Sequence, residues 1–109
     1  VAGSAAVGAA GHSDYGAVFA RFRTRHAGAL GPRATLIVTG DARNNYRGPG
    51  LADFRALAAR ARRVFWLNPE PRARWDTTDS IMAGYAPHCH GVFEARTLRQ
   101  LAAFVREIA

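Results

Sequence analysis

The amino-acid sequence predicts an α/β domain with a Rossmann-like parallel sheet flanked by helices. Two short runs, Leu36 to Val38 and Val64 to Leu67, are apolar without polar alternation, which is typical of strands covered on both faces. Stretches with apolar residues at helical spacing surround them. The order helix, strand, helix, strand, short helix, strand, helix implies right-handed crossovers and a parallel sheet with helices on its faces.

Length and composition limit the chain to one domain. It has 109 residues, of which 49% are hydrophobic, enough for a single core. All fifteen basic residues are arginines, a bias that we attribute to a GC-rich coding sequence more than to a selected surface. The net charge of +7 still favours an acidic partner, a nucleic-acid backbone or an anionic surface. A single cysteine, Cys89, excludes an internal disulfide framework and fits a reducing compartment, so we expect a cytoplasmic protein.

The first part of the chain predicts a linker, a helix and a strand. Residues 1–10 are mostly Gly and Ala, which predicts a linker or loop, with the domain covering residues 11–109. Ser13 or Asp14 is a natural N-cap for the helix that follows, and glycines and a proline end that helix before residue 33. The first predicted strand spans residues 34–39.

Five more elements are predicted after Gly50. They are a helix from Leu51, a strand over 64–67, a short helix over 79–85, a strand over 91–95 and a last helix that Thr97 and Gln100 begin with a capping box. That helix has a broad apolar face, and each large side chain contributes about 1.5 to 3 kcal/mol if buried. Three strands make a thin sheet, so we expect at least one more strand upstream of Val1. The start at Val and not Met also suggests a fragment.

Asp41 is the strongest candidate for a functional residue. It follows the first predicted strand directly, and in open α/β sheets the ligand lies beyond the carboxyl ends of such strands. A carboxylate at that position loses solvation unless it meets a cation, backbone donors or water. A hard divalent ion such as Mg²⁺ would use it directly or through water. The alternative is an Asp that caps its own turn by local hydrogen bonds.

Other groups of residues carry weaker signals. Ser13 and Asp14 lie at a helix start, where they could bind an anion, supply a hydroxyl ligand or cap the helix. The sequence His88-Cys89-His90 contains metal-binding residue types, but one thiol and no second pair fall short of a zinc signature. A triad of Ser13, His26 and Asp41 lacks any nucleophile elbow.

The loop after the second predicted strand offers an aromatic anchor. Trp75 lies among Arg72, Arg74 and Asp76, and Trp and Arg dominate the energetic hot spots of protein interfaces. The alternative is that Trp75 packs onto the sheet edge. The arginines at 21, 23, 25, 60, 62 and 63 accompany no RNA-binding aromatic motif and no recognition helix, so we interpret them as solvated faces.

Four segments together resemble a known family. They are GHSDYG (11–16), TGDARNNY (39–46), VFWLNPEPRARWDTTDS (64–80) and GVFEARTLRQLAAFV (91–105). They are similar to the C-terminal part of von Willebrand factor type A (vWA) domains, specifically the bacterial CoxE-like family with its WLNPEP segment. The resemblance covers nearly the whole chain after about Gly11. It implies a vWA-like α/β fold that is truncated at the N-terminus.

The resemblance implies a metal-ion-dependent adhesion site (MIDAS) built from three loops. Ser13 matches the Thr of the second loop with a shorter hydroxyl residue, and Asp41 matches the Asp of the third loop. The first loop, an Asp-x-Ser-x-Ser motif, occurs nowhere in the chain. We therefore expect a Mg²⁺ or Mn²⁺ site that needs this upstream loop, with Ser13 and Asp41 as its ligands from these residues.

The resemblance also implies a non-enzymatic protein-interaction module. Its partner would be an AAA+ ATPase of the MoxR type that presents an acidic residue to the cation. The two would act in the maturation of, or metal insertion into, an enzyme such as carbon monoxide dehydrogenase. The residues that we expect to contact the partner are Asp14, Arg43, Asn44, Tyr46 and Trp75.

Two other classes of function stay open at this point. One is a small metal-dependent α/β hydrolase or phosphoryl-transfer enzyme that uses Asp41. It needs a further acid or base near the strand ends, and Glu70, Asp76 and Asp79 are the available carboxylates. The other is a basic nucleic-acid binder, whose affinity would fall steeply with salt. No apolar run approaches the roughly 20 residues of a membrane span.

Overall fold

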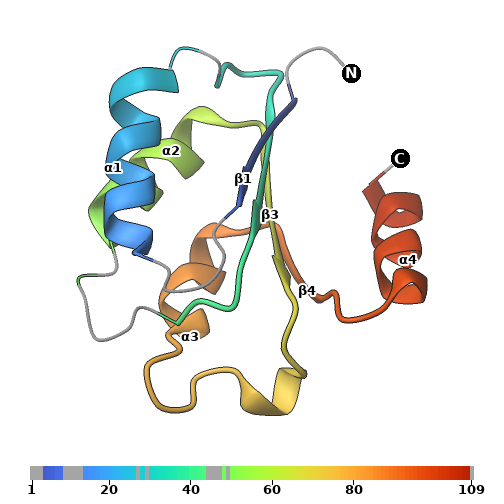
Figure 1. Cartoon of the computed structure of the whole chain (residues 1–109). Helices are drawn as coiled ribbons and strands as arrows, with labels where there is room; N and C mark the ends of the chain where they lie inside the picture. Colours follow the sequence, from blue (N-terminus) through green and yellow to red (C-terminus); the bar gives the residue numbers. More distant parts are fainter. Residues whose placement is uncertain are drawn as a thin grey trace.

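Four parallel strands form the sheet on which the chain is built. The computed structural model describes residues 4–8, 14–26, 28, 30–43, 48 and 50–108, and of residues 4–8 only the backbone. The elements are β1 (Ser4–Gly8), α1 (Tyr15–His26), β2 (Thr35–Thr39), α2 (Leu51–Arg60), β3 (Arg63–Asn68), η2 (Arg72–Arg74), α3 (Met82–Tyr85), η3 (Ala86–His88), β4 (Gly91–Glu94) and α4 (Leu98–Ile108). The strand order is β1-β2-β3-β4, all parallel. The predicted α/β class with a parallel sheet is confirmed (Figure 1).

Strand β1 corrects the prediction made for the first ten residues. The sequence predicts a linker over residues 1–10, but Ser4–Gly8 pair with β2 in parallel register, from Ser4 opposite Thr35 to Gly8 opposite Thr39. The small residues of this strand have little intrinsic β-propensity. The strand forms because the edge of β2 presents backbone donors and acceptors that need partners. The described sheet therefore has four strands where the sequence predicts three.

Helices cover the two faces of the sheet unequally. Figure 1 shows α1, α2 and α3 on one face and α4 on the other. The strands follow one another in the sheet in the order of the sequence. Right-handed crossovers that all run in one direction place their helices on the same face of the sheet. The N-termini of α1 and α2 meet at Gly16 and Gly50. Gly50 has a φ of 67°, and a Cβ on it would lie 2.7 Å from the Gly16 Cα, so the position requires glycine.

An aromatic core joins α1, α2 and α3 to β3. Its rings come from Tyr15, Phe19, Phe54, Trp66 and Tyr85, none of which is more than 1% exposed. The rings of Trp66 and Tyr85 stack with centroids 4.5 Å apart and planes 18° apart. Such aromatic pairs add about 0.5 to 1.5 kcal/mol each beyond the burial of their area. This core fixes where α1 begins relative to the strand ends.

Helix α4 has the broad apolar face that the sequence predicts, and the structure buries only part of it. Phe104 is 4% exposed and packs with Phe65 and Leu67 on the second face of the sheet. Leu98, Leu101 and Val105 are 85%, 40% and 54% exposed. The stabilisation expected for a buried side chain therefore does not apply in full to these three residues. The helix contacts the sheet through the side that carries Phe104, and its other large apolar side chains lie outside this contact.

The capping residues predicted for α1 and α4 make the expected hydrogen bonds. The Ala17 amide donates to Asp14 Oδ1 at 3.1 Å, so Asp14 caps α1. At α4 the Gln100 amide donates to Thr97 Oγ1 at 3.1 Å, and the Thr97 amide donates to Gln100 Oε1 at 3.2 Å. These two bonds make the capping box. The short helix predicted from residue 79 begins later, at Met82.

Candidate functional site at the carboxyl edge of the sheet

Two loops meet where the parallel strands end, at the lower edge of the sheet in Figure 1. Residues 40–43 follow β2, and residues 69–81 connect β3 to α3. An isolated antiparallel bridge pairs Arg43 with Ser80. The Ser80 hydroxyl also donates to the backbone oxygen of Asp41 at 3.3 Å. The two loops therefore form one continuous structure at the edge where α/β sheets bind ligands.

Asp41 is held in this edge by two hydrogen bonds. Its Oδ1 accepts from the Tyr15 hydroxyl at 3.1 Å and from the Arg43 amide at 2.9 Å. The second bond closes a local turn, which is the alternative role that the sequence left open. The side chain is half-buried. Among the described residues both bonds go to Oδ1, so Oδ2 is the atom that a further ligand would use.

The backbone around Asp41 is shaped for this contact. Ala42 has a φ of 60°, a left-handed conformation that is uncommon for a residue other than glycine. Its amide donates to the Tyr15 hydroxyl at 2.9 Å. Gly40 lies so close to the Tyr15 hydroxyl that an added Cβ would collide with it. A side chain at position 40 would therefore displace the hydroxyl that holds Asp41.

Tyr15 is a site residue that the sequence analysis misses. An aromatic residue in the first turn of a helix looks like a core residue, and its ring is indeed fully buried. Its hydroxyl, however, bridges Asp41 and Ala42. The available signal was that a buried tyrosine needs a partner for its hydroxyl.

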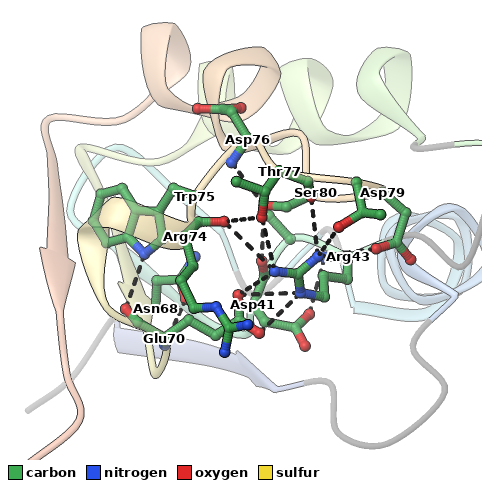
Figure 2. Close-up of polar contacts among 12 residues, drawn as sticks. Asp41, Arg43, Asn68, Glu70, Arg74, Trp75, Asp76, Thr77, Asp79 and Ser80 are labelled. Carbon is green, nitrogen blue, oxygen red and sulfur yellow. Dashed lines mark hydrogen bonds and ion pairs between the residues drawn. The ribbon is translucent and has the colours of Figure 1, made fainter.

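Arg43 lies at the centre of the polar contacts in Figure 2, and we call the group Arg43, Glu70, Thr77 and Asp79 the Arg43 cluster. Its Nε donates to both carboxylate oxygens of Glu70, at 2.8 and 3.1 Å. Its Nη1 donates to Asp79 Oδ1 at 3.1 Å and to the backbone oxygen of Thr77 at 3.0 Å. The hydrogen bond to Glu70 is the main reason that the pKa of Arg43 lies above its ordinary value. The guanidinium thus braces residues 69–81 against the end of β2.

Trp75 lies on the same loop and is half-buried. Its indole nitrogen donates to the backbone oxygen of Glu70 at 3.0 Å, and the Arg72 guanidinium lies 4.3 Å from the ring centroid. The side chain also packs against the hydrophobic core that includes the aromatic rings. Trp75 is therefore packed against the fold as one alternative predicted, and part of its side chain stays exposed.

The other predicted site residues divide into two groups. Asp14 is at the start of α1, where it caps the helix. Ser13, Asn44 and Tyr46 lie outside the described residues.

The histidines around Cys89 have structural contacts. His90 Nδ1 accepts from the Val64 amide at 3.0 Å, and the ring of His88 lies edge-on to Phe54 at 6.3 Å. The Cys89 thiol donates to the backbone oxygen of Tyr85 at 3.4 Å, and burial raises its pKa to about 12. Each of these three side chains therefore has a contact within the fold.

The described part of the chain does not by itself form a metal site. Within it, no three His, Cys, Asp or Glu side chains are grouped so that they could hold a metal ion. A carboxylate oxygen such as Asp41 Oδ2 is a ligand that Mg²⁺ or Mn²⁺ prefers. The described residues therefore fit such an ion only as contributors to a larger set of ligands.

Comparison with known proteins gave one match. The model of a family described as "VWA domain containing CoxE-like protein" matches residues 2–104, which includes β1. Neither the curated proteins nor the solved structures gave a match. In the described residues, none of the helices has the length and apolar character required to span a bilayer.

Proposed function

This chain belongs to the family of VWA domain-containing CoxE-like proteins, and we propose that it binds a protein partner through the carboxyl edge of its sheet. Membership of this family is consistent with a protein-interaction module. The observation that carries the proposal is the position of Asp41 at that edge. One of its carboxylate oxygens is fixed by Tyr15 and Arg43, and the other is left for a ligand.

A divalent cation is the ligand that we propose for Asp41. Asp41 would hold Mg²⁺ or Mn²⁺ directly or through water, together with the hydroxyl of Ser13. The remaining ligands would come from an Asp-x-Ser-x-Ser loop, which the sequence given does not contain. The bound cation would offer an open coordination position to an acidic side chain of the partner.

The Arg43 cluster supports this role by limiting movement at the edge. Binding to a preorganised surface costs less conformational entropy than binding to a mobile one. Because Arg43 bonds to Glu70 and Asp79, we propose that it positions the loop and does not itself contact the partner protein. The neighbours that we propose as partner contacts are Asp14, Asn44, Tyr46 and Trp75.

The identity of the partner rests on family analogy. We propose an AAA+ ATPase of the MoxR type, acting with this module in the maturation of a metalloenzyme such as carbon monoxide dehydrogenase. We also propose a cytoplasmic location, because a single cysteine fits a reducing compartment.

A metal titration of the natural full-length protein tests the site. Thermal unfolding is followed with increasing Mg²⁺ or Mn²⁺, and we expect stabilisation of about 2.7 kcal/mol when the ion is at roughly 100 times its dissociation constant. Asp41→Asn should lose most of this shift. Asp53→Asn, which removes an equal charge from an ion pair with Arg23 between α1 and α2, should keep it. No shift in the natural protein, or an undiminished shift in Asp41→Asn, would exclude the site.

An enzymatic role for Asp41 has less support from the geometry. The carboxylates that such a reaction would need are occupied in structural contacts. Glu70 and Asp79 accept from Arg43, and Asp76 Oδ1 accepts from the Ala83 amide at 2.7 Å. Turnover of a generic phosphate ester by the full-length protein, abolished in Asp41→Asn, would favour the enzyme over the binding module.

A further inference from the structure

A groove runs along the outer side of α1, on a different surface from the carboxyl-edge loops. Five of the described residues line it: Val18, Arg21, Phe22, Arg25 and His26. They occupy positions i, i+3, i+4, i+7 and i+8, so they share one face of the helix. The volume of the groove is about 250 Å³. This is enough space for an apolar side chain of a partner.

The groove combines an apolar floor with a basic rim. Val18 and Phe22 are half-buried and pack against the hydrophobic core that includes the aromatic rings, so their exposed parts are held in place. Arg21 and Arg25 are exposed at the rim. Within the described residues neither of them makes an ion pair, whereas Arg23 on a neighbouring face pairs with Asp53 at 2.9 Å.

Helix stability alone does not account for this arrangement. Basic residues in the last turn of a helix interact favourably with its dipole, by about 0.3 to 1 kcal/mol each. That effect explains Arg25 and His26, which lie in the last turn of α1. It does not explain Arg21, which lies earlier in the helix, or the apolar side chains between the charges.

We propose that this groove binds an acidic amphipathic segment of a partner protein. An apolar side chain of that segment would lie on Val18 and Phe22, and its carboxylates would pair with Arg21 and Arg25, which are suited to forked carboxylate contacts. This is the pattern of a helix bound in a groove, in which anchors repeat at helical spacing. Nucleic acid would use the arginines but not the apolar floor. The inference is independent of the carboxyl-edge site, because Asp41 takes no part in it.

The probe for this surface is a fluorescein-labelled synthetic peptide of Glu with Leu at helical spacing. Its affinity for the chain is measured by fluorescence anisotropy, beside a peptide of the same composition with the leucines scattered. The double variant Arg21→Glu with Arg25→Glu should weaken binding at least about tenfold, while Arg99→Glu with Arg106→Glu on α4 should change it by less than roughly twofold. Asp41→Asn should bind like the natural sequence. Both pairs of arginines are exposed, and far-UV circular dichroism checks that each variant is folded.

Three results would overturn the proposal. Equal loss in the two double variants would mean that binding depends only on net charge. Equal binding of the scattered peptide would mean that Val18 and Phe22 are not used. Displacement of the peptide by a short DNA duplex of higher affinity would assign the surface to nucleic acid. The double variant Arg21→Gln with Arg25→Gln removes the two positive charges without adding negative ones. It should still weaken binding, by less than the Glu pair, which shows that the loss does not come only from repulsion by the new carboxylates.

Discussion

Tyr15 connects the core of the protein to its candidate site. Its ring is fully buried among the aromatic residues, 5.7 Å from Trp66 by centroids. Its hydroxyl reaches Asp41 and Ala42 beyond the end of β2. The position of the Asp41 carboxylate therefore depends on how α1 packs on the sheet.

At this scale we predict that Tyr15→Phe destabilises the chain by about 1 to 3 kcal/mol, because the buried Ala42 amide loses its acceptor while the ring remains. The free energy of unfolding in urea measures the change. Thr24→Val is the matched control. It removes another hydroxyl of α1, bonded to the Ala20 backbone oxygen at an exposed position, and should change stability by less than about 0.5 kcal/mol. Similar effects of the two substitutions would contradict the bridging role of Tyr15.

At the scale of elements, α4 attaches to the sheet through a small contact. Phe104 lies 5.6 Å from Phe65 and 5.0 Å from Phe93, measured between ring centroids. Leu98 and Val105 are mostly exposed on the same helix. Phe104 is therefore the buried anchor of α4, and Ile108 packs beside it only partly buried.

We predict that Phe104→Ala lowers the free energy of unfolding by about 3 to 5 kcal/mol, the range for large aromatic residues in cores. Leu98→Ala on the same helix should lower it by less than about 0.5 kcal/mol, because the side chain is 85% exposed. Chemical denaturation of both variants gives the comparison. If Leu98→Ala proved as damaging as Phe104→Ala, the apolar side of α4 would have to be covered in solution.

At the scale of the molecule, β1 completes the described sheet and carries the chain into α1. All five of its residues pair with β2, and β2 in turn pairs with β3. The strand end of β2, from which Asp41 extends, is therefore supported on both sides. Without β1, β2 would become an edge strand with unpaired backbone groups.

We predict that deleting residues 1–8 destabilises the chain, since each lost ladder bond is worth about 0.5 to 1.5 kcal/mol net. Deleting residues 1–3 leaves Ser4–Gly8 in place and should have little effect. Urea denaturation of the two truncated chains distinguishes a strand from the linker that the sequence predicts. Equal stability of both truncations and the intact chain would favour the linker.

Much of the fold could be predicted because its signals are local. The apolar runs that contain Leu36 and Trp66 predict buried strands, and the structure has them in β2 and β3. The Asp14 cap and the capping box of α4 involve residues within three positions of each other. The position of Asp41 at a strand end follows from the same kind of pattern.

Sequence by itself thus determined the parallel α/β class and the edge at which Asp41 lies, because apolar runs and capping residues act over a few neighbouring positions. Only the tertiary structure decided the pairing of β1, the Tyr15 bond to Asp41 and the contact of Arg43 with Glu70. These contacts join residues 26 or more positions apart. A local pattern also predicts that one face of a helix is apolar, but it does not predict how much of that face another element covers. The exposure of Leu98 therefore could not be predicted from the sequence.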